Sequence, residues 1–121
     1  MEKTFHICDA AQDDAHVADL FYNTETERFR IIIDPSVNVS KLPLSLKMHA
    51  ERGRYELNES FAMDWIRQRI CPPSRHNISA ILREAGLREY SEFGILSWTQ
   101  GYSDMDDLYL SKEIGSNAGT I

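Results

Sequence analysis

The residues of this chain best suited to metal binding or proton transfer are its four histidines, His6, His16, His49 and His76. No two of them stand four residues apart, and no pair of cysteines lies beside them. A zinc site needs ligands that converge on one point. The spacing therefore predicts that the histidines are structural and that the chain has no metal site.

Ser74, Arg75 and His76 place a hydroxyl close to an imidazole, as a nucleophile and its general base would be. Residues this close together on a helix point in different directions, so they do not form a Ser–His pair. Ser74 is better explained as a helix N-cap. We expect neither an enzyme nor a bound cofactor.

Three acids near the C-terminus, Asp104, Asp106 and Asp107, resemble half of a calcium loop. The glycine and the terminal glutamate that such a loop needs are missing at the required spacing. We expect a solvated acidic turn, with docking to a partner as the alternative.

The stretch from Asn58 to Leu110 has the clearest helical pattern. Asn58 or Ser60 can cap a first helix, which ends at Pro72-Pro73. Its apolar face holds Phe61, Trp65, Ile66 and Ile70. Arg67 and Arg69 are expected off that face, near the C-terminus of the helix.

A second helix is predicted over residues 74–85, with Gly86 at its C-terminal end. Its apolar positions are Ile78, Ile81, Leu82 and Ala85. We expect Trp65 and Ile66 to be buried together with Ile78, Ile81 and Leu82 across the proline corner. A shorter helix follows from Ser91 to Gly101, and the final strand covers Leu108–Leu110.

The first part of the chain predicts β structure. Thr4–Cys8 is expected as an edge strand, followed by strands Val17–Tyr22 and Arg28–Ile33 around a polar hairpin loop. Residues 36–46 are expected to form a loop with Leu42, Leu44 and Leu46 reaching inward. Together these elements predict an α+β fold: an N-terminal antiparallel sheet, a small helical cluster and a short final strand. We expect one domain over residues 1–112 and a flexible tail over residues 113–121.

Charge and composition narrow the class of protein. The chain has 121 residues and a formal net charge of -6, which argues against direct nucleic-acid binding because that needs a basic surface. No apolar run approaches membrane-spanning length, and the N-terminus lacks the apolar region of a signal peptide. Cys8 and Cys71 fit free thiols in a reducing cytoplasm better than a disulfide. We therefore expect a cytoplasmic protein without membrane contact.

The second half of the chain carries a group of arginines: Arg67, Arg69, Arg75, Arg83 and Arg88. On two short helices they could mimic a helix-turn-helix motif. The negative net charge favours the other interpretation, in which they pair with acids of the same chain, including the turn at residues 104–107.

Several pieces of this region together resemble the N-terminal region of HipA-like proteins, including short versions carried by phage and mobile elements. The pieces are Trp65, the run RICPPSR at 69–75, Leu82–Leu87, the run GYS at 101–103, and Asp106-Asp107. The resemblance covers roughly the second half of the chain. Longer HipA-like proteins continue into a kinase-like core. This sequence has no glycine-rich nucleotide loop and no catalytic-loop aspartate with a downstream metal-binding asparagine, so kinase activity is not expected.

The resemblance implies a non-catalytic interaction module that binds and regulates another protein, with a kinase-like toxin core as a candidate partner. The alternative is an anti-CRISPR-like inhibitor of a host defence nuclease, whose acidic surface would fill a basic channel. The residues expected to contact the partner are Trp98, Tyr102, Asp104, Asp106, Asp107 and Arg75.

Overall fold

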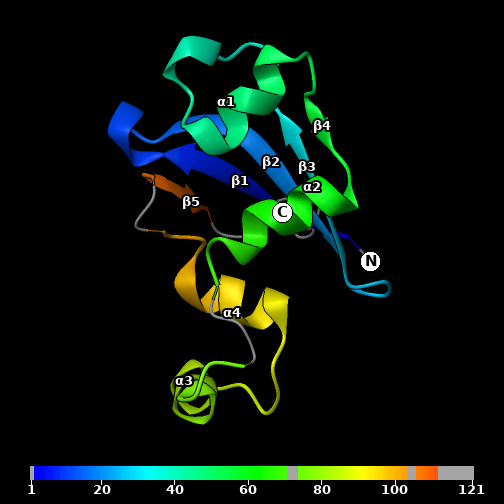
Figure 1. Cartoon of the computed structure of the whole chain (residues 1–121), viewed down its shortest axis with the longest axis vertical. Coiled ribbons are helices and arrows are strands. Elements are labelled where there is room, and N and C mark those ends of the chain that lie inside the picture. Colours follow the sequence, from blue (N-terminus) through cyan, green and yellow to red (C-terminus); the bar gives the residue numbers. More distant parts are fainter. Residues whose placement is uncertain (1, 71–73, 104–105, 112–121) are drawn as a thin grey trace, which may run out of the picture.

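The computed structural model describes residues 2–70, 74–103 and 106–111. A five-stranded antiparallel sheet in the order β4-β3-β2-β1-β5 forms one layer, and helices cover one of its faces (Figure 1). The strands are β1 (Glu2–Asp9), β2 (Ala15–Asn23), β3 (Arg28–Ile33), β4 (Glu56–Leu57) and β5 (Leu108–Leu110). The helices are α1 (Leu44–Glu51), α2 (Glu59–Arg67), α3 (Ile78–Ala85) and α4 (Glu92–Thr99), with single 3-10 turns at Ala10–Gln12 and Val39–Lys41. The predicted α+β fold is confirmed.

Alternation along the strands places one face of the sheet in the core. In β3, Phe29, Ile31 and Ile33 are buried, whereas Ile32 lies on the opposite face and is half-buried. The buried face packs against residues of α1, α2 and α4, including Leu46, Ile66 and Leu96. The other face, called the polar face below, carries His6, Asp19 and Arg30 together with Phe21 and Ile32.

The first strand is not at the edge of the sheet, so that prediction was wrong. β5 pairs with β1 in antiparallel register, with Ile7 opposite Leu110 and Cys8 opposite Tyr109. The sequence pattern cannot show this, because the pairing residues stand at opposite ends of the chain. Residues 104, 105 and 113–121, which include Asp104 and the expected tail, lie outside the described residues.

The loop predicted over residues 36–46 is in part the start of helix α1. Leu42 and Leu46 are buried as expected, but Leu44 is 74% exposed. Residues two apart on a helix lie on nearly opposite sides, so Leu44 and Leu46 cannot both face the core. The alternating leucines gave a false β-like signal.

Helix α2 agrees with the sequence prediction at its start and along its apolar face. Asn58 is the N-cap, and its Oδ1 accepts a hydrogen bond from the Phe61 N–H at 3.2 Å. Trp65 and Ile66 are buried, whereas Phe61 and Ile70 are partly buried against the core. Helix α2 ends at Arg67, short of the predicted end at Pro72-Pro73, and the two prolines themselves lie outside the described residues.

Helix α3 departs from the prediction. It begins at Ile78 rather than Ser74, and none of its residues is fully buried. Figure 1 shows α3 at the far end of the molecule from the sheet, so that its neighbour is α4 rather than α2. The expected burial of Ile78, Ile81 and Leu82 with Trp65 was therefore wrong. Gly86 does end the helix in the left-handed conformation, with φ +74°.

Candidate functional site

The aromatic residues predicted to contact a partner are exposed. Trp98, on α4, is 46% exposed, and Tyr102 is 53% exposed, with its ring stacked on that of Tyr109. Arg75 and Asp107 are also exposed. The structure therefore places four of the six predicted partner-binding residues, Trp98, Tyr102, Arg75 and Asp107, on the surface.

Asp106 differs from these residues because its side chain is only 8% exposed. Its Oδ2 pairs with the guanidinium of Arg69, and its Oδ1 accepts from the Leu108 N–H at 3.1 Å. The prediction of a solvated acidic turn was therefore wrong for Asp106, whose carboxylate is buried and paired within the chain.

Arg69 is buried, contrary to the expectation that it lies off the apolar face of its helix. Its guanidinium carbon lies 3.9 Å from the centre of the Trp65 ring, and its Nη1 donates to the Gly101 carbonyl at 2.9 Å. The pairing of this arginine with the acidic turn agrees with the interpretation that the arginines pair within the chain. The pair ties the end of α2 to the segment between α4 and β5.

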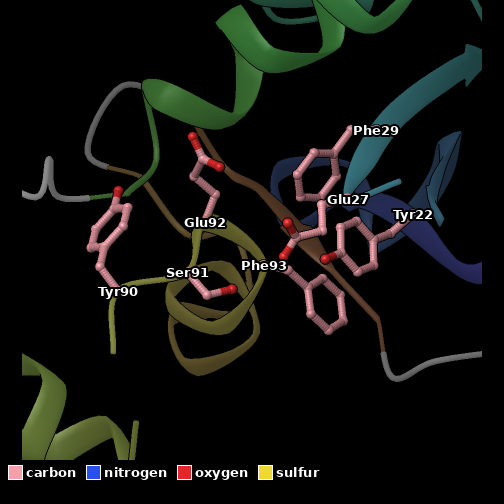
Figure 2. A pocket seen from close by; sticks show the side chains of 7 residues that line it. All are labelled: Tyr22, Glu27, Phe29, Tyr90, Ser91, Glu92 and Phe93. Atoms are coloured by element: carbon pink, nitrogen blue, oxygen red, sulfur yellow. The ribbon is translucent and has the colours of Figure 1, made fainter. Parts of the chain in front are cut away.

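Helix α4 is attached to the sheet at its N-terminal end (Figure 2). Ser91 caps the helix, and its Oγ accepts from the Gly94 N–H at 3.0 Å. The ring of Phe93 stacks on that of Tyr22, with the centres 4.1 Å apart. The hollow in Figure 2, between the Tyr22–Phe29 hairpin and residues 90–93, has a volume of about 150 Å³. Ligand pockets of proteins usually span roughly 300–1,000 Å³, so this hollow is too small for an organic cofactor.

On the polar face of the sheet, a β-bulge in β2 brings together residues that the sequence keeps apart. Ile7 of β1 pairs with Ala18, but Cys8 pairs with His16, so Val17 is an extra residue in β2. In a regular strand, residues three apart point to opposite faces. The extra residue turns His16 to the same face as Asp19.

His6 lies directly opposite Asp19 across the β1–β2 pair, which completes the cluster. Asp19 Oδ1 is 2.7 Å from His6 Nδ1 and 2.8 Å from His16 Nε2. The two imidazole rings meet edge to face, with centres 4.3 Å apart. One donor atom from each of the three residues lies within 4.8 Å of the other two.

A second carboxylate stands behind His16. Asp34 Oδ2 lies 3.5 Å from His16 Nδ1, the ring nitrogen that points away from Asp19. Hydrogen bonds from the backbone N–H and hydroxyl of Ser36 lower the pKa of Asp34, which is therefore ionised at neutral pH. His16 thus has a carboxylate at each ring nitrogen.

The neighbouring groups of the cluster are less reactive. Burial raises the pKa of the Cys8 thiol, so it stays protonated at neutral pH. A hydrogen bond with Asp14, together with burial, raises the pKa of Tyr109 to about 12. Neither group provides a nucleophile.

The sequence did not predict that His6 and His16 both contact Asp19. The missing signal is the bulge, because regular alternation places His16 and Asp19 on opposite faces. Val17-Ala18 breaks the alternation of β2, but Leu20-Phe21-Tyr22 does so as well, so the pattern alone does not locate the bulge. His49 and His76 lie outside the cluster: His49 packs on Phe61, and His76 is exposed.

Within residues 2–70, 74–103 and 106–111, none of the helices has the length and apolar character needed to cross a membrane. Comparison of the chain with protein-family models, with curated proteins and with solved structures finds no match.

Proposed function

We propose that this chain is a non-catalytic interaction module that binds and regulates a partner protein, as its resemblance to the N-terminal region of HipA-like proteins implies. A kinase-like toxin core is the partner class that the resemblance favours. Two observations carry the proposal: amphipathic helix α3 has no fully buried residue, and Trp98 is exposed on α4, the helix that α3 contacts.

Helix α3 supports the proposal through an apolar face that the fold leaves incompletely covered. Ile78, Ile81 and Leu82 fall on one side of the helix and are only half-buried. Tertiary packing normally supplies most of the stability of so short a helix. A partner that covers this face would supply packing that α4 alone does not.

Helix α4 supports the proposal because it holds the exposed Trp98 on a helix that is packed against the core. Its N-terminal end is held against the sheet by Phe93, and its middle residues Ile95 and Leu96 are buried. Trp98 therefore projects from a helix that is anchored in the core. Tryptophan is enriched among the residues that contribute most to protein interfaces.

The competing nuclease-inhibitor function would need a row of exposed acids that imitates nucleic-acid phosphates. Asp106 is withdrawn from that row by its pairing with Arg69, which leaves Asp107 exposed beside it. Asp13 and Asp14 are also exposed. The internal pairing of Asp106 nevertheless removes one acid from the row and favours apolar docking over electrostatic mimicry.

We predict that Trp98→Ala weakens partner binding by at least roughly 30-fold, because an interface tryptophan typically contributes about 2 kcal/mol or more. The tagged chain is purified from the cell that encodes it, the bound protein is identified, and affinities are then measured with the purified partner. The expected partner is a kinase-like protein whose affinity depends only modestly on salt.

Asp107→Lys is the matched control, because Asp107 is exposed and its charge is the one that nuclease mimicry would use. It should change the affinity little at either of two salt concentrations. A large loss in Asp107→Lys, with steep salt dependence and a neutral Trp98→Ala, would instead support the nuclease inhibitor. Thermal melts of both variants check that any loss of affinity does not come from unfolding.

A further inference from the structure

We propose that His6, His16 and Asp19 form a binding site for a divalent transition-metal ion, with Zn²⁺ as the best fit. The proposal depends on the geometry of the β1–β2 pair and is independent of the proposed interaction function. It names a site on the polar face of the sheet, away from the buried face that packs against α2.

The donor atoms already converge. His6 Nδ1 and His16 Nε2 both lie within 2.8 Å of Asp19 Oδ1. Tetrahedral zinc, with Zn–N distances of about 2.0 Å, places its ligand atoms about 3.3 Å apart. The Asp19 carboxylate would withdraw from each imidazole by about half an ångström to admit the ion. The two imidazole nitrogens, which lie within 4.8 Å of each other, would settle at the same tetrahedral spacing.

The side chains have room for this adjustment. The side chains of His6, His16 and Asp19 are 39%, 36% and 30% exposed, so none is locked in close-packed surroundings. Their backbones are held by the paired strands and by the bulge at Val17. The site thus combines a fixed backbone with side chains that can turn slightly.

The second carboxylate behind His16 is placed to orient this imidazole toward a bound ion. A neutral imidazole has one N–H, so it can donate to Asp19 or to Asp34 but not to both. With an ion on Nε2, the proton lies on Nδ1 and points to Asp34 Oδ2, 3.5 Å away. Metal-bound histidines commonly donate their other N–H to a carboxylate in this way.

The donor set indicates the class of ion. Imidazole nitrogens suit Zn²⁺, Cu²⁺, Ni²⁺ and Fe²⁺, whereas Mg²⁺ and Ca²⁺ prefer oxygen ligands throughout. Three protein ligands leave a position for water on the exposed side. The ion would join β1 to β2 across the bulge and stabilise the folded chain, because the unfolded chain does not hold these ligands together.

We predict that isothermal titration of the full chain with ZnCl₂ gives saturable binding of one equivalent, whereas MgCl₂ gives none. His16→Ala and Asp19→Asn should each remove the saturable isotherm. Asp34→Asn should lower the affinity by roughly 10–100-fold, as is typical when the partner of a metal-bound histidine is lost. Zn²⁺ should also raise the Tm of the wild-type chain but not that of His16→Ala.

His76→Ala is the matched control, because it removes an exposed histidine outside the cluster. It should bind Zn²⁺ like the wild type. Ring ¹⁵N NMR of the unmutated chain provides a second measurement that does not depend on the folding of a variant: Zn²⁺ should shift His6 Nδ1 and His16 Nε2. The proposal is overturned if no saturable binding occurs, if His16→Ala binds unchanged, or if the shifts appear on other histidines.

Discussion

Replacing Asp106 with alanine is expected to lower the free energy of unfolding by about 3–5 kcal/mol, a large part of the stability of a small domain. The loss is large because Arg69, the partner of Asp106, stays buried in the variant without a counter-charge. The side chain of Arg69 is 1% exposed and cannot reach water once its carboxylate is gone. Urea unfolding followed by circular dichroism measures the effect.

Two further variants distinguish the effect of leaving the Arg69 charge buried and unpaired from the effect of losing any one carboxylate. Asp107→Ala removes an exposed acid one position away and should change stability by no more than about 0.5 kcal/mol. Arg69→Met combined with Asp106→Ala should recover much of the loss, because both buried charges are then gone. Equal midpoints for Asp106→Ala and Asp107→Ala would refute the buried placement of Asp106.

Trp65→Ala is the second substitution with a large expected effect, at about 3–5 kcal/mol. Trp65 is 2% exposed and lies beneath the Arg69 guanidinium, so its loss leaves a cavity and uncovers a buried cation. Its effect should not add to that of Arg69 variants, because the two side chains are in contact. Thermal and urea unfolding test the prediction.

The chain provides its own control for this experiment, since its other tryptophan is on the surface. Trp98→Ala should change stability by less than about 1 kcal/mol, because Trp98 is 46% exposed. Trp65→Phe should cost less than Trp65→Ala, because the ring is kept. The indole Nε1 of Trp65 also has no hydrogen-bond partner among the described residues, so phenylalanine removes an unpaired donor. Similar losses for Trp65→Ala and Trp98→Ala would mean that the assignment of core and surface is wrong.

The parts of the fold that local pattern determines could be predicted from the sequence. Arg28–Ile33 forms a strand with the expected bounds because Phe29 and the three isoleucines favour a strand and turn residues flank the segment. Asn58 caps α2 because its side-chain oxygen satisfies an N–H nearby in the chain. The final strand at Leu108–Leu110 was also confirmed.

The parts that depend on distant residues could not be predicted. An arginine near the end of a helix is ordinarily exposed. Burial of Arg69 depends on a carboxylate 37 residues away and on the distant Gly101 carbonyl. The position of α3 follows from its attachment to α4, which its own apolar spacing does not show. The His6–Asp19 contact needs the strand register, and the His16–Asp19 contact needs the bulge as well.

The pairing of β5 with β1 has a consequence for how the chain is made. The His6 N–H donates to the Ser111 hydroxyl at 3.0 Å, and these two residues are 105 positions apart in sequence. The ribosome releases the N-terminus first. The edge of β1 that pairs with β5 therefore stays unpaired until nearly all the described residues have emerged. Contacts over such a separation also form slowly. The strand that is interior in the native sheet is thus an open edge during synthesis, when pairing with another nascent chain is the main hazard.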